Sequence, residues 1–99
     1  MGNLIHDNSN IQARIDLLES LLNENYVCPI SQTTFIDPVI ADDCQTYDRI
    51  NIENWLKVSN NSPITNEILK SKELRPNFFV KEQIEDLISK IAELKQHLK

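Results

Sequence analysis

The segment YVCPISQTTFIDPV, residues 26–39, contains a Cys-Pro-Ile turn of the kind that opens a zinc-binding finger. A zinc finger would place a second cysteine two to four residues later, and this chain does not. A single structural zinc site needs about four Cys or His ligands, and two sites need twice as many. The whole supply is Cys28, Cys44, His6 and His97, with the histidines at opposite ends of the chain. We therefore expect no metal, and we interpret Cys28 as a small buried apolar residue.

Composition excludes several classes of function. The 99 residues, 40% of them hydrophobic, fit one small core. A net charge of −5 without a Lys/Arg cluster argues against a nucleic-acid partner, which requires a basic face. Apolar runs stay well short of the ~20 residues that span a membrane, so we expect no membrane association. We also expect no cofactor and no catalytic residue, because a Gly-rich phosphate loop is missing and neither histidine lies near a thiol in the sequence.

The cysteine content also bears on location. Two cysteines without an apolar leader suggest a reducing compartment, so we expect the cytoplasm or the nucleus. If the chain is an effector that a bacterium secretes, that compartment is the cytosol of the host.

Two amphipathic helices are predicted at the ends of the chain, within residues 1–25 and 80–99, around a mixed segment 26–79. Their apolar stripes have helical spacing and comprise Ile11, Ile15, Leu18 and Leu22 in the first helix, and Ile84, Leu87, Ile91, Leu94 and Leu98 in the second. The spacing leaves three arrangements open. The helices could pair within one chain, form a homodimer through residues 11–22 and 84–98, or receive a target.

The mixed segment predicts an α+β fold. Residues 38–40 and 45–48 read as a short β-hairpin, followed by a helix over 49–59 with Asp48 as its N-cap. The only glycine is Gly2, so positive-φ positions should fall on the Asn and Asp residues of 41–44 and 59–63. Trp55 would lie on the flank of the central helix, either filling the core or serving as an exposed anchor for a partner.

Six short motifs carry a resemblance to a known family: CPIS (28–31), DPV (37–39), TYDR (46–49), IENWL (52–56), SPIT (62–65) and LRPN (74–77). Their order and spacing, from about Tyr26 to Ile88, closely resemble the U-box family of ubiquitin ligases. The resemblance implies a small RING-like fold with a β-hairpin, a central helix and two loops, in which side-chain contacts replace two zinc ions. It also implies core positions at Val39, Ile52, Leu56, Leu69 and Leu74 and a polar network at Asp37, Asp48, Arg49 and Asn77 that pins the loops.

The resemblance implies a docking site as well. In the family, a shallow groove receives a ubiquitin-conjugating enzyme that carries ubiquitin as a thioester. The matching positions are Ile30, Trp55 and Pro63, with Ile64 beside them. The ligase would hold the thioester in a reactive geometry and would promote ubiquitin transfer to a substrate lysine without forming a covalent intermediate.

Two departures from the family pattern affect this expectation. The family usually has Gly-His before TYDR, where this chain has Cys44 and Gln45. Many active members carry Arg or Lys after the SPIT motif, where this chain has Asn66. That cation links the conjugating enzyme to ubiquitin, so Asn66 should support a lower activity. The alternative function is a non-catalytic scaffold that binds partners through dimerising helices.

Overall fold

The computed structural model describes residues 8–98, so His6 lies outside the described residues. The described chain forms helices and short strands in an α+β arrangement, as predicted. In chain order they are α1 (Asn8–Asn25), β1 (Pro38–Ile40), β2 (Thr46–Asp48), α2 (Arg49–Leu56), β3 (Arg75–Pro76) and α3 (Phe78–Lys95).

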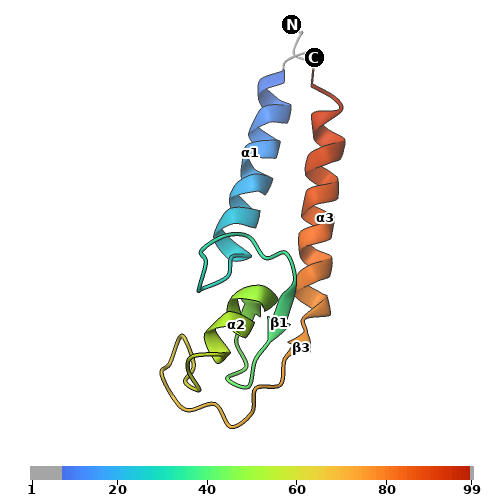
Figure 1. The fold of residues 1–99 in the computed structure, drawn as a ribbon. Coiled ribbons are helices and arrows are strands. Elements are labelled where there is room, and N and C mark those ends of the chain that lie inside the picture. Colours follow the sequence, from blue (N-terminus) through green and yellow to red (C-terminus); the bar gives the residue numbers. More distant parts are fainter. Residues whose placement is uncertain (1–7, 99) are drawn as a thin grey trace, which may run out of the picture.

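The two long helices lie side by side and form an arm that extends from the small mixed core (Figure 1). Ile15 on α1 and Ile91 on α3 are 1% and 7% exposed, because each stripe is covered by the other helix. The remaining stripe residues are buried or half-buried. Of the three arrangements that the spacing left open, pairing within one chain is therefore the one observed.

The sheet is three-stranded and antiparallel, in the order β2-β1-β3. The predicted hairpin is present, with Val39 opposite Tyr47. The sequence did not predict β3, whose two residues pair with the other edge of β1 and place Arg75 opposite Ile40. A pair of residues that includes proline is too short to show strand alternation. This strand leads directly into α3 and so ties the arm to the core.

The core lies between the sheet, α2 and the first turns of α3. The expected core residues Val39, Ile52 and Leu56 are buried, while Leu69 and Leu74 are partly buried against them. The cluster of buried residues consists of Cys28, Phe35, Val39, Ala41, Tyr47, Ile52, Leu56 and Ile84. The burial of Cys28, which is 0% exposed, is confirmed.

The left-handed backbone positions were predicted wrongly. They are Gln32, Cys44 and Asn66, with φ of 61°, 64° and 65°. Only one of the three is Asn or Asp, and it lies outside the two segments that were expected to hold them. Hydrogen bonds of the loops set these conformations; the Cys44 N–H, for example, donates to the Ala41 carbonyl at 2.9 Å and closes the hairpin turn.

Replacing Cys44 tests this conformation. A β-carbon in the left-handed region costs roughly 1–2 kcal/mol, whereas glycine adopts it freely. We expect Cys44→Gly to be more stable than Cys44→Ala by about 1 kcal/mol in denaturant unfolding. Both variants lose the exposed thiol, so the comparison isolates the β-carbon. Equal stabilities would contradict a strained turn.

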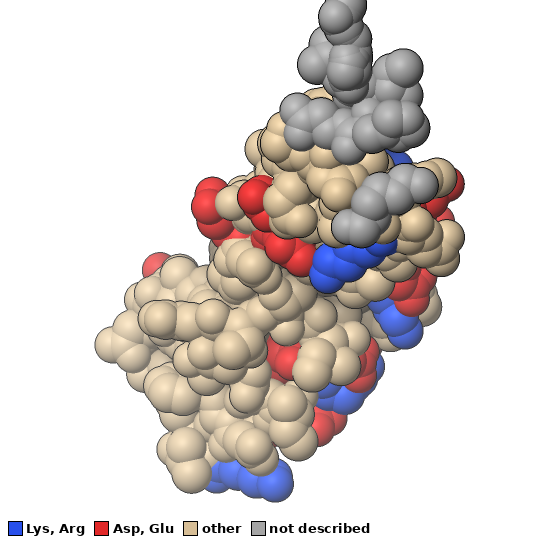
Figure 2. Space-filling view, turned by 90° about the horizontal axis from the view of Figure 1, so that it is seen from above, with Lys and Arg blue, Asp and Glu red and all other residues tan. Residues whose placement is uncertain are grey.

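In Figure 2, acidic and basic side chains lie close to one another on part of the face, a wide area at the lower left is uncharged, and the described residues there form no broad basic patch. Among the described helices, none combines the length and the apolar character needed to cross a bilayer.

Candidate functional site

The first loop, residues 26–37, is closed at its base by an isolated bridge between Val27 and Thr34. Inside it, the Cys28 N–H donates to the Thr33 carbonyl at 2.9 Å, and the Gln32 N–H donates to the Cys28 carbonyl at 2.7 Å. These bonds give the Cys-Pro-Ile turn a fixed shape and leave Ile30 near its tip.

Asp48 anchors the end of this loop. The residue is 4% exposed, and its carboxylate accepts the backbone N–H groups of Ile36 at 3.0 Å and Asp37 at 2.7 Å. Asp48 occupies the N-cap position of α2, as predicted, but its side chain makes no cap hydrogen bond, because the carboxylate turns to the loop instead. Arg49 adds an ion pair to Asp37 at 2.8 Å. Three of the four expected network residues therefore meet at the first loop.

The fourth expected network residue, Asn77, contacts other elements. Its amide nitrogen donates to the Thr46 hydroxyl of β2 at 2.8 Å, and its oxygen accepts the Val80 N–H at 3.0 Å. Asn77 therefore caps α3 and fastens it to the sheet.

Cys28 is buried in the core and also accepts hydrogen bonds. Its sulfur accepts the Asp48 N–H at 3.2 Å and the Asn51 side-chain amide at 3.6 Å. Burial raises the pKa of the Cys28 thiol, but the N–H donors around the sulfur outweigh this effect, so the pKa lies below its ordinary value. The sulfur thus joins the first loop to the start of α2 through hydrogen bonds.

The second loop, residues 60–69, is closed by a bridge between Asn61 and Ile68. Ser62, which is 2% exposed, organises its tip. The Ser62 hydroxyl accepts the N–H groups of Ile64 at 3.1 Å and Thr65 at 3.0 Å. Pro63 has no N–H, so the hydroxyl reaches the next two amides, and the proline is held at the outer side of a tight turn.

An acidic side chain from the hairpin turn fixes this loop to the core. The Asp43 carboxylate accepts the Ser62 hydroxyl at 2.7 Å, the Tyr47 hydroxyl at 2.6 Å and the Gln45 N–H at 3.0 Å. We call Asp43, Tyr47 and Ser62 the Asp43 cluster. The Asp43 cluster fixes the second loop to the core, as Asp48 fixes the first loop.

The pKa values of Asp43 and Tyr47 are shifted in opposite directions. Burial alone would raise the pKa of Asp43, but the hydroxyls of Ser62 and Tyr47 and the backbone N–H groups lower it below its usual range. Burial of the ring, followed by the bond to Asp43, raises the pKa of Tyr47 far above its ordinary value. The pair therefore persists as carboxylate and phenol at neutral pH.

The sequence alone did not identify the Asp43 cluster. Asp43 was explained there by turn formation, and its serine partner lies 19 positions away. The available signal was the combination of a tyrosine four residues after an aspartate in a hairpin turn and a serine before proline. Nothing in that pattern indicates that the three side chains meet.

The predicted docking residues lie on both loops and on α2. Ile30 and Trp55 are partly buried and pack against the same core cluster. The Trp55 indole N–H donates to the Asn61 carbonyl at 2.6 Å, which ties α2 to the second loop. Pro63 is half-buried, and Ile64 is 47% exposed beside it. Trp55 thus both packs on the core and presents part of its ring.

Asn66, the position at which the resemblance led us to expect a cation, is exposed. Its N–H donates to the Ser62 carbonyl at 2.9 Å, and its side-chain oxygen accepts the Asn61 amide at 3.1 Å. Among the described residues, no group of three His, Cys, Asp or Glu side chains could hold a metal ion.

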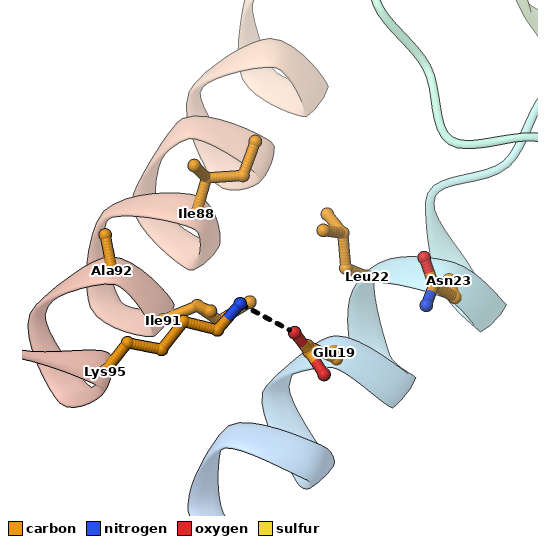
Figure 3. Close-up of a pocket in the computed structure, with 7 residues that line it drawn as sticks. All are labelled: Glu19, Leu22, Asn23, Ile88, Ile91, Ala92 and Lys95. Carbon is orange, nitrogen blue, oxygen red and sulfur yellow. Dashed lines mark ion pairs between the residues drawn. The ribbon is translucent and has the colours of Figure 1, made fainter. Parts of the chain in front are cut away.

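Two hollows flank the arm. One, of about 320 Å³, lies between Leu22 of α1 and Ile88 of α3, and an ion pair between Glu19 and Lys95 at 3.4 Å crosses it (Figure 3). The other is lined by Leu17, Leu18 and Leu94 with charged residues at its rim. Apolar atoms form most of the lining surface of both hollows.

Comparison with known proteins matches the chain to one protein family. The model of the U-box domain family matches residues 22–93, so the match reaches into both helices of the arm. The chain is similar to U-box domain-containing protein 35 of Arabidopsis thaliana, at 44% identity over 54% of this chain and 6% of that protein.

Two further relatives cover more of the chain. WD repeat, SAM and U-box domain-containing protein 1 of Homo sapiens is 37% identical over 68% of this chain and 14% of that protein. U-box domain-containing protein 18 of Arabidopsis thaliana is 39% identical over 80% of this chain and 12% of that protein. The chain thus spans a small part of the length of these relatives.

Proposed function

Because the chain belongs to the U-box family, whose members generally act in ubiquitin ligation, we propose that it binds a ubiquitin-conjugating enzyme charged with ubiquitin. In this proposal the chain promotes ubiquitin transfer from the thioester to a substrate lysine. Its contribution is orientation of the thioester, since a covalent step on this chain would need an accessible nucleophile beside a base. The buried sulfur of Cys28, engaged by Asp48 and Asn51, is unsuited to that task.

One observation carries this proposal: the hydrogen bond of 2.6 Å between the Trp55 indole and the Asn61 carbonyl. It joins α2 to the second loop, while Ile30 approaches the same core cluster from the first loop. An apolar docking surface for a transient partner needs such anchors on rigid supports. The Asp43 and Asp48 carboxylates supply that rigidity by fixing each loop through backbone or hydroxyl donors.

A single-turnover discharge assay tests the proposal and the role of Asn66 together. A conjugating enzyme loaded with ubiquitin is mixed with free lysine, with and without this chain, across a panel of conjugating enzymes. We expect Asn66→Arg to speed discharge, because a charge-assisted hydrogen bond is about twice as strong as a neutral one. A gain of about 1–2 kcal/mol corresponds to roughly a five- to thirtyfold rise in rate.

The matched control uses the left-handed backbone of Asn66, whose φ is 65°. Asn66→Gly removes the amide and retains that conformation freely, so we expect slower discharge with an unchanged fold. Affinity for the uncharged conjugating enzyme should stay constant in both variants. Discharge at the wild-type rate in both would exclude Asn66 from the reactive arrangement. A wild-type chain that stimulates no enzyme of the panel would contradict the ligase proposal.

The second candidate function is a non-catalytic scaffold that self-associates through the arm. The exposed apolar residues of the arm favour it: Leu17 is 61% exposed, Leu21 39% and Ile88 50%, beside the two hollows. The dimer would then use the outer faces of residues 11–22 and 84–98, since the inner faces already contact each other.

Sedimentation of the full chain tests this candidate. We expect a dimer to form in the micromolar range and Leu17→Gln to weaken it about tenfold or more, because a central apolar contact is lost. Ile36→Gln on the first loop is the matched control, because its side chain is 84% exposed and lies outside the arm. This variant should dimerise as the wild type does. A wild-type chain that remains monomeric at these concentrations would exclude the dimer.

A further inference from the structure

Two asparagine side chains face each other in the second loop. The Asn61 amide nitrogen donates to the Asn66 side-chain oxygen at 3.1 Å. The loop brings them together because the bridge between Asn61 and Ile68 closes its base, and the Ser62 N–H donates to the Glu67 carbonyl at 2.7 Å.

Two hydrogen bonds hold the backbone of Asn61. The Trp55 indole binds its carbonyl at 2.6 Å, and its own N–H donates to the Ser59 hydroxyl at 3.1 Å. Asn61 is half-buried, whereas Asn66 is exposed. Asn61 is therefore the more enclosed member of the pair, and the hydrogen bond from its side-chain N–H group sets the orientation of the Asn66 amide.

That orientation has a chemical consequence. A side-chain amide has one acceptor end and one donor end, and rotation by half a turn exchanges them. With its oxygen bound to Asn61, Asn66 turns its acceptor end into the loop and keeps its N–H donors for a bound molecule. Arg offers donors in any orientation, but an Asn can act as a donor only if its amide is held one way round.

We propose that Asn61 is a positioning residue that fixes the Asn66 amide with its N–H donors toward the charged conjugating enzyme. This inference rests on the proposed ligase function. It assigns to Asn61 a role in transfer that neither its location on the loop nor the family match provides.

Asn61→Asp tests the inference with little change in shape. A carboxylate only accepts, so it can pair with Asn66 only if the amide turns, which presents the oxygen outward. We expect single-turnover discharge to slow about fivefold, the effect of losing one neutral hydrogen bond. Affinity for the uncharged conjugating enzyme and the denaturation midpoint should remain those of the wild type. Asn61→Ala, which frees the amide to rotate without adding charge, should slow discharge by a smaller factor.

The same substitution in a second background separates orientation from charge. In an Asn66→Gly background, Asn61→Asp should cause no further slowing, because no amide remains to be turned. Equal slowing in the Asn66→Gly background would reveal a charge effect and overturn the inference.

The outcomes distinguish this inference from the function on which it rests. An active wild type whose rate is unchanged by both Asn61→Asp and Asn61→Ala overturns the role of Asn61 and leaves the ligase function standing. A wild type without activity across the panel overturns both. A fivefold loss confined to backgrounds that retain the Asn66 amide supports both.

Discussion

Asp43→Ala is expected to lower the free energy of unfolding by about 3 kcal/mol, through the loss of a shared acceptor. The Asp43 carboxylate receives the hydroxyls of Tyr47 and Ser62, which are 0% and 2% exposed. Truncation leaves both hydroxyls without this acceptor in surroundings that water reaches poorly, and each such group costs about 1–3 kcal/mol. Denaturant unfolding at neutral pH measures the loss.

A double-mutant cycle identifies its source. Tyr47→Phe removes one donor, so the Asp43→Ala and Tyr47→Phe changes together should cost less than the sum of the single changes. Asp43→Asn is the matched control, since it keeps the shape and one acceptor oxygen and should cost about half as much. A loss below about 1 kcal/mol for Asp43→Ala would show that the second loop is held by other contacts.

The pH dependence follows from the lowered pKa of Asp43. A carboxyl whose pKa is lower in the folded chain stabilises the fold above its unfolded value of about 3.9, and the contribution is lost as the pH falls through the folded value. The raised pKa of Tyr47 acts at the other end, where stability is present below about pH 10 and is lost as the pH rises further. Asp43→Asn should therefore show a weaker acid-induced loss than the wild type.

The long helices and the hairpin could be predicted because each repeats a local pattern. The stripe around Ile15 and Ile91 has helical periodicity, and the strands that contain Val39 and Tyr47 flank a turn rich in Asp. The choice between pairing within the chain and dimerisation was not local. It depends on how the core orients α1 and α3 relative to each other, and the spacing of apolar residues within each helix does not specify that orientation.

The polar contacts that fix the two loops could be predicted only in part. The resemblance placed Asp48 in the network, but the use of its carboxylate as a loop anchor, and not for a cap hydrogen bond, depends on where the first loop passes. The left-handed Gln32 and Cys44 were missed because propensity favours Asn and Asp, while tertiary hydrogen bonds set the conformation here. Contacts between residues far apart in sequence, such as the Asp43–Ser62 contact, cannot be predicted from the periodicity of apolar residues.

The docking residues Ile30, Trp55, Pro63 and Ile64 came from the resemblance, and their role remains a prediction. What the fold adds is a reason for the first three to be rigid. Cys28 and Asp48 fix the loop that carries Ile30, and the Ser62 hydroxyl fixes the turn at Pro63. Trp55 links α2 to the second loop. Rigid anchors lose little conformational entropy when a partner binds.

Ile30→Ala should weaken binding of a conjugating enzyme about thirtyfold, which is the loss of roughly 2 kcal/mol expected for a central apolar anchor. Pro63→Ala should weaken it about tenfold, because the turn loses part of its preset geometry as well as contact area. Calorimetric titration with the uncharged enzyme measures both. Ile30 also packs on the core, so its truncation should cost about 1–2 kcal/mol of stability, and the titrations must be run well below the unfolding midpoint.

The matched control for these binding measurements is Ile88→Ala on α3. Ile88 is 50% exposed and lines a hollow of the arm, so the same kind of truncation is made on the other candidate surface. Under the ligase proposal Ile88→Ala binds as the wild type does, while Ile30→Ala binds weakly. The reverse order would move the docking surface to the arm and favour the scaffold. Equal losses in both variants would indicate a general loosening of the fold, because the two side chains lie on different elements and no single small docking surface would require both.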